Sequence, residues 1–97
     1  MAALKSEIVE AVCSKIGLPH YRIFLFGSRA NGTADARSDI DVGIESPEAI
    51  PLHVLNDIKV ELDDIPLLQK IELVDFASVT QDFRNIALRD IEVLYEK

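Results

Sequence analysis

The run YRIFLF, residues 21–26, is the stretch that most constrains the fold. Its β-branched and aromatic side chains favour a strand, and an uninterrupted apolar strand is typically covered on both faces of its sheet. The turn Gly27-Ser28 ends the run. This pattern predicts a sheet with helices packed against it.

A second strand is expected over DIDVGI, residues 39–44, because polar and apolar positions alternate along it. The apolar positions would face the core. The other positions place two carboxylates, those of Asp39 and Asp41, on the opposite face of the sheet.

Periodicity and stop signals predict the remaining elements. Apolar residues recur at helical spacing over residues 3–16, 51–63 and 80–90. KIELVDF, residues 70–76, is a third strand candidate, while IEVLY, residues 91–95, fits either an extension of the last helix or a short edge strand.

Residues 28–33 are expected to form a short helical turn, and residues 33–38 a loop. The order of elements predicts an α/β (α+β) fold in which a small mixed β-sheet packs against helices. A chain of 97 residues is expected to form a single domain, residues 1–97.

The composition argues against several classes of protein. No stretch approaches the roughly 20 apolar residues that cross a bilayer, and the N-terminus lacks the pattern of a signal peptide. Cys13 is the only cysteine, so no internal disulfide can form. The net charge of −7 argues against a direct nucleic-acid-binding face, because phosphates would be repelled. These features favour a cytoplasmic protein without membrane contact.

Asp39 and Asp41 form the pattern that points to chemistry. Two unit charges about 4 Å apart repel by on the order of 4 kcal/mol at an effective dielectric constant near 20. A divalent cation removes this repulsion by binding oxygen atoms of both. Mg²⁺ prefers one or two carboxylates together with substrate phosphate oxygens, so the pair suits a metal completed by a bound phosphate.

Gly27 and Ser28 can supply a phosphate-binding turn. Glycine lets the backbone approach a ligand, Ser28 offers a hydroxyl, and free N–H groups at the start of a helical turn face an anion. Arg29 and Arg37 are nearby cations. The turn and the metal would together hold a nucleoside triphosphate, and in-line attack on the α-phosphorus would release pyrophosphate.

A third carboxylate would complete such a site, and the candidates are Glu72 and Asp75. They lie three residues apart on the expected third strand, so they face opposite sides of the sheet and only one can join the aspartate pair. The residues alone leave this choice open, because they do not fix the register of the strand.

The turn Gly27-Ser28, followed after ten residues by Asp39-x-Asp41, resembles the pattern of the DNA polymerase β-like nucleotidyltransferase superfamily. From its first helix to Tyr95 the chain is similar to the smallest branch, the minimal nucleotidyltransferase (MNT) family. Members of that family are often antitoxins encoded beside a HEPN-domain RNase toxin. The resemblance implies a nucleotidyltransferase fold that consists of the catalytic domain only.

The same resemblance implies roles for individual residues. The first acidic position of the family's third strand falls on Glu72 rather than Asp75. The implied activity is transfer of AMP from ATP to a hydroxyl, which could be a tyrosine of a HEPN toxin partner. A two-metal Mg²⁺ site, the catalytic centre and the phosphate-binding turn would then be formed by Asp39, Asp41, Glu72, Gly27, Ser28 and Arg29.

Two other functions are compatible with the sequence. A non-catalytic antitoxin would neutralise its partner by contact alone. A small-molecule nucleotidyltransferase of the antibiotic-modifying type is disfavoured, because 97 residues leave no second domain to build a substrate pocket unless the chain forms a homo-oligomer. A hetero-oligomer with a partner subunit is plausible for either antitoxin.

Overall fold

The computed structural model describes residues 2–27 and 39–97. The expected helical turn over residues 28–33 and the loop over 33–38 lie outside these ranges. Helices and strands follow one another in the order α1 (Ala2–Cys13), β1 (Arg22–Phe26), β2 (Ile40–Glu45), α3 (Leu52–Asp63), β3 (Ile71–Asp75), α4 (Gln81–Ala87) and β4 (Glu92–Glu96).

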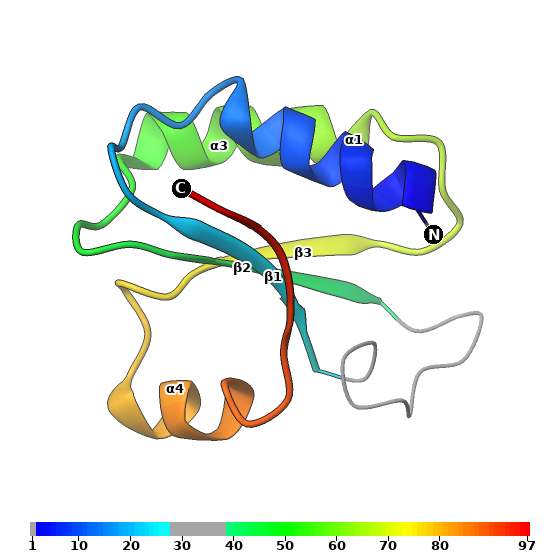
Figure 1. Cartoon of the computed structure of the whole chain (residues 1–97). Helices are drawn as coiled ribbons and strands as arrows, with labels where there is room; N and C mark the ends of the chain where they lie inside the picture. Colours follow the sequence, from blue (N-terminus) through cyan, green and yellow to red (C-terminus); the bar gives the residue numbers. More distant parts are fainter. Residues whose placement is uncertain (1, 28–38) are drawn as a thin grey trace.

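In the part of the chain that the structure describes, four strands form one mixed sheet in the order β3-β2-β1-β4. β1 runs antiparallel to β2 and β4, whereas β2 and β3 are parallel and are connected through α3. Helices α1 and α3 cover one face of the sheet, and α4 lies on the other (Figure 1). The structure therefore confirms a mixed sheet packed against helices.

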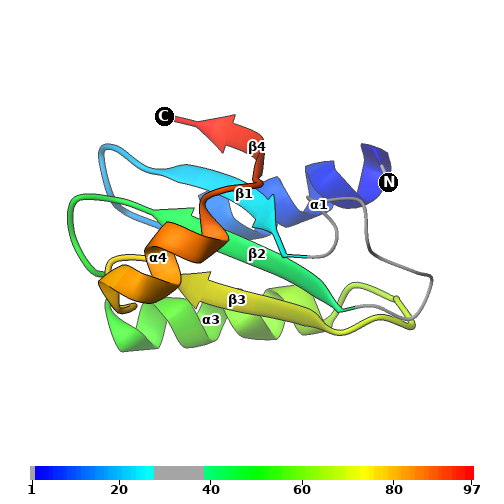
Figure 2. The same ribbon diagram turned by 90° about the horizontal axis from the view of Figure 1, so that it is seen from below.

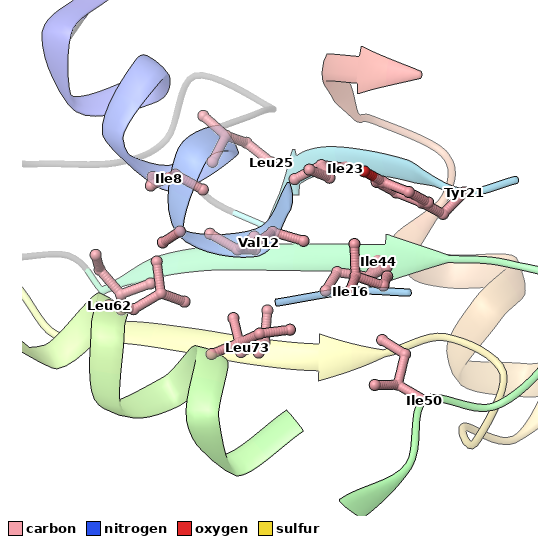
Figure 3. Packing of buried hydrophobic residues seen from close by; sticks show 14 of the residues in the cluster. Ile8, Val12, Ile16, Tyr21, Ile23, Leu25, Ile44, Ile50, Leu62 and Leu73 are labelled. Atoms are coloured by element: carbon pink, nitrogen blue, oxygen red, sulfur yellow. The ribbon is translucent and has the colours of Figure 1, made fainter. Parts of the chain in front are cut away.

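The larger core lies between the sheet and the helices α1 and α3 (Figure 3). The alternation of residues 39–44 has the expected result, since the apolar positions of β2 are buried there. Helix α1 presents Ile8 and Val12, and α3 presents Ile58 and Leu62, all of them fully or almost fully buried.

A second, aromatic cluster lies on the face that α4 covers. Phe24, Phe26 and Phe76 are buried together, and the rings of Phe24 and Phe76 meet edge to face at 4.9 Å between centroids. A Cβ on Gly43 would lie 2.5 Å from the ring of Phe24 and 2.7 Å from that of Phe76. Only glycine at this position of β2 leaves room for both rings.

Arg84 links helix α4 to the sheet through polar contacts. Arg84 forms an ion pair with Glu45 at the end of β2, and its Nη1 also donates a hydrogen bond of 3.3 Å to the carbonyl oxygen of Phe76. Glu45 accepts a second hydrogen bond, of 2.6 Å, from Nε of Arg22. Figure 2 shows α4 lying across the end of the sheet where β3 finishes.

Several boundaries differ from the sequence-based expectation. Helix α4 ends at Ala87 rather than at residue 90, and β2 begins at Ile40, so Asp39 precedes the strand. Helix α1 ends at Cys13 rather than at residue 16, although Ile16 still donates a backbone hydrogen bond of 2.9 Å to Val12. Residues 91–95 contribute to the edge strand β4 instead of extending α4, because β1 offers them a partner. Within residues 2–27 and 39–97, no helix has the length and apolar character that crossing a bilayer requires.

Candidate active site

The strand register brings the candidate residues to one end of the sheet. β1 ends at Phe26, which pairs with Asp41 near the start of β2, and Asp41 in turn pairs with Glu72 near the start of β3. Side chains of directly paired residues share a face. Phe26, Asp41 and Glu72 therefore share the face that carries α4, and Gly27 directly follows Phe26 at this end of the sheet.

Gly27 and Asp41 are in direct contact. Gly27 has φ +71°, a backbone conformation that residues with a Cβ rarely adopt. A Cβ on Gly27 would lie 2.4 Å from Oδ2 of Asp41, which is too close for two non-bonded atoms. Because residue 27 has no side chain, the carboxylate of Asp41 can pack directly against the backbone of the turn.

Negative charge is concentrated around Asp41. Partial burial raises the pKa of its carboxyl above the ordinary value, and the charges of Asp39 and Glu72 raise it further. Asp39 is exposed and directly precedes β2. The three carboxylates repel one another, and this is the electrostatic condition that a bound cation relieves.

Glu72 has a partner that the sequence analysis overlooked. Nζ of Lys70 lies 3.0 Å from Oε1 of Glu72, and this carboxylate raises the pKa of Lys70. Both side chains are largely exposed. The spacing could have revealed the pair, because residues two apart on a strand share a face.

Asp75 lies on the other face of the sheet, where its carboxylate is buried and hydrogen-bonded to nearby loops. It pairs with Ile44, is 6% exposed, and accepts hydrogen bonds of 3.0 Å from the backbone N–H groups of Ile50 and Ala77. The hydroxyl of Ser78 donates a third, at 3.3 Å. A buried carboxylate satisfied in this way joins the end of β3 to the segment before α3, away from the Asp41 cluster.

The carboxylates of Asp39, Asp41 and Glu72 are suitable ligands for a hard divalent cation, although their side chains are not arranged as a preformed metal site. Mg²⁺ takes oxygen ligands, and the carboxylates that raise the pKa of Asp41 supply them. As the side chains stand, no group of three Asp, Glu, His or Cys residues in the described ranges is arranged to hold a metal ion. Glu72 faces Lys70, so it would have to exchange this ion pair for the cation.

Ser28, Arg29 and Arg37, the other residues expected to contact the triphosphate, lie outside the described ranges. What the described residues form is a glycine turn in contact with the carboxylate of Asp41, beside Glu72 on the neighbouring strand. This arrangement has the components needed to hold a phosphate ester together with a metal ion.

The chain belongs to the polymerase β nucleotidyltransferase family, because residues 20–97 match the family described as "Polymerase beta, Nucleotidyltransferase". A relative from Haemophilus influenzae, "Probable protein adenylyltransferase MntA", is 32% identical over 97 residues, which cover 97% of this chain and 84% of that protein. The expected resemblance to the minimal branch is thereby confirmed.

Solved structures share the fold at lower sequence identity. A chain of "Crystal structure of the toxin-antitoxin with AMP-PNP" superposes with a TM-score of 0.79 and 22% identity, covering 96% of this chain and 73% of that one. A chain of a structure described as tri-AMPylated Shewanella oneidensis HEPN toxin in complex with MNT antitoxin gives a TM-score of 0.76 and 18% identity, with coverages of 99% and 72%. These likenesses confirm the nucleotidyltransferase fold.

Proposed function

We propose that this protein transfers AMP from ATP to a hydroxyl group of a HEPN-domain toxin and thereby acts as its antitoxin in the cytoplasm. The observation that carries the proposal is the contact of Asp41 with Gly27, beside Glu72 on the neighbouring strand. The name of the Haemophilus influenzae relative, a probable protein adenylyltransferase, supports this activity. The neighbouring complex of a tri-AMPylated HEPN toxin with an MNT antitoxin supports the class of partner.

The residues have distinct roles in this reaction. Gly27 admits the triphosphate close to the backbone, and Ser28 and Arg29 bind its phosphates. Asp39, Asp41 and Glu72 hold Mg²⁺, which would neutralise charge on the triphosphate and on departing pyrophosphate. Glu72 also receives the proton of the attacking hydroxyl as the new bond to the α-phosphorus forms and the bond to pyrophosphate breaks.

Label transfer tests the proposal directly. The protein is incubated with Mg²⁺, ATP labelled in the α-phosphate and a HEPN-domain protein from the same organism as the proposed partner. We expect label on that partner with wild-type protein and none with Asp41→Asn. Asp57→Asn is the matched control, because Asp57 is an exposed aspartate on α3, on the opposite face of the sheet. Equal labelling by wild type and Asp41→Asn, or no labelling by either, contradicts the proposal.

The same variants separate catalysis from neutralisation by contact. In cells that express the HEPN-domain protein, an Asp39→Ala/Asp41→Ala double variant should fail to protect if AMP transfer is the mechanism. Full protection by a double variant that shows normal folding by circular dichroism would instead identify an antitoxin that acts by binding alone.

A further inference from the structure

An apolar surface cavity of about 270 Å³ lies next to the candidate site, between the end of β1 and helix α4. Sites that take a whole small molecule usually exceed about 300 Å³, so this cavity suits one part of a larger ligand. Its lining comes from two strongly separated segments of the chain, namely Phe26, Gly27, Phe83, Ile86, Ala87 and Asp90.

Gly27 joins the cavity to the candidate site. It lines the cavity, and it also contacts the carboxylate of Asp41. Phe26, the other cavity residue from this segment, is the direct strand partner of Asp41 and lies on the same face. A ligand whose phosphates lie at the Gly27 turn therefore has the cavity within reach of its remaining part.

The wall formed by α4 is apolar and only partly covered. The ring of Phe83 packs against the ring of Phe26 at 6.1 Å between centroids, yet Phe83 remains 40% exposed. Ile86, one turn further along α4, is 66% exposed. The Arg84–Glu45 ion pair holds this helix against the sheet, so the wall has a defined position.

We propose that this cavity holds the base of the donor nucleotide, which lies flat against the apolar wall of α4. The inference rests on the proposed function. A base suits the lining because it offers a planar, weakly polar surface, and aromatic side chains bind any base by stacking. A phosphate group does not suit it, since none of the lining side chains is a cation and Asp90 carries a negative charge.

Two probes separate the base from the phosphates. Mg²⁺–ATP carries both, whereas Mg²⁺–tripolyphosphate carries the phosphates alone. Titration calorimetry on wild type should show tighter binding of ATP. Ile86→Asn should weaken ATP binding about tenfold, because it places a polar side chain on the apolar wall against which the base packs, and it should leave tripolyphosphate binding unchanged.

The matched control is Val60→Asn. Val60 is 62% exposed on α3, so the substitution introduces the same side chain at a similar helical position on the opposite face. It should alter neither affinity. An Ile86→Asn protein that binds ATP as tightly as wild type overturns the base site while leaving the proposed function intact. If wild type binds neither probe, the proposed function fails and this inference fails with it.

Methyl signals in nuclear magnetic resonance spectra give a second measurement that needs no substitution. ATP should shift the methyl resonances of Ile86 and Ala87, and tripolyphosphate should leave them in place. The methyl resonances of Val60 should respond to neither. Equal responses of Ile86 and Ala87 to the two probes would overturn the assignment of this cavity to the base.

Discussion

The carboxylate of Asp41 occupies the space in which a side chain of residue 27 would begin. Oδ2 of Asp41 is only 2.4 Å from the point where a Cβ on Gly27 would lie. The turn after β1 and the acid at the start of β2 therefore depend on each other, and a methyl group added at residue 27 must displace the carboxylate.

Gly27→Ala should separate activity from stability. Displacement of Asp41 by about 1 Å is expected to lower AMP transfer about 100-fold. The unfolding free energy should fall by only about 1–2 kcal/mol, the cost of a left-handed backbone at a residue with a Cβ. Label transfer and chemical denaturation measure the two quantities. Gly17→Ala is the control, because a Cβ there meets nothing within 4 Å; equal activity losses in both variants would contradict the explanation.

Asp41→Asn should stabilise the protein in the absence of metal. The raised pKa of Asp41 means that charging it opposes folding. The penalty is absent below its ordinary pKa of 3.8, grows as the pH rises towards the folded-state pKa and is then constant. Since the side chain is partly exposed, we expect a gain of up to about 1 kcal/mol.

Urea denaturation in EDTA measures this gain at pH 7 and at pH 3, where it should vanish. Addition of Mg²⁺ should stabilise wild type more than Asp41→Asn and so reduce the difference at pH 7. An Asp41→Asn protein that is less stable than wild type at pH 7 without metal would show that the carboxylate is not repelled by its neighbours.

Lys70→Gln should increase the affinity for Mg²⁺. In the wild type the cation must displace the ammonium group of Lys70 from Glu72. Exposed ion pairs are weak, so the expected gain is about two- to fivefold. Calorimetric titration measures the affinity, and Lys59→Gln on α3 is the control for the change in net charge. Weaker Mg²⁺ binding in Lys70→Gln alone would mean that Lys70 assists the site.

Glu45→Gln should destabilise the fold by about 1 kcal/mol at pH 7, because two charged hydrogen-bond partners lose their acceptor. Burial by itself would raise the pKa of Glu45, but the hydrogen bonds and charges of Arg84 and Arg22 outweigh it and lower the pKa. The contribution of Glu45 is therefore complete above its ordinary pKa of 4.5 and is lost as the pH falls through the lower folded-state value.

The unfolding free energies of wild type and Glu45→Gln should accordingly differ at pH 7 and converge as the pH falls below the folded-state pKa of Glu45. Glu48→Gln, a change at an exposed glutamate in the loop after β2, should follow wild type throughout. A difference between wild type and Glu45→Gln that does not depend on pH would assign the effect to packing instead of charge.

Gly43→Ala should destabilise the protein more than the other substitutions do. The added Cβ would meet the rings of Phe24 and Phe76 at 2.5–2.7 Å, and both rings are fully or almost fully buried, so other core residues must move with them. Overpacking of this kind typically costs about 1–3 kcal/mol. Thermal denaturation measures the loss, and a melting temperature equal to that of wild type would show that the aromatic cluster is loosely packed.

Sequence patterns predicted the parts of this fold that depend on local chemistry. The alternation of residues 39–44 is sufficient to place Asp41 on the face opposite the larger core, because that core buries the alternate apolar positions of β2. The choice between Glu72 and Asp75 required the register of β3 against β2, and this register is set by tertiary pairing. Residues 91–95 were ambiguous for the same reason, since only the free edge of β1 makes them a strand.

The features that could not be predicted from the sequence involve pairs of distant residues. No local pattern around Asp75 predicts that its carboxylate accepts a hydrogen bond from the backbone of Ile50, 25 residues earlier. The cavity at α4 combines Phe26 with Ile86, which no periodicity connects. Such relationships arise from packing and become visible only with coordinates.

The parallel pairing of β2 with β3 has a consequence for the nascent chain. Gly27 and Asp41 can meet as soon as the local hairpin of β1 and β2 forms, but Glu72 arrives only after α3 has been made and has crossed the sheet. Long-range strand pairing is slow compared with hairpin closure. The complete set of carboxylates should therefore assemble late in folding. An intermediate that contains only the hairpin would have Asp39 and Asp41 in place without Glu72.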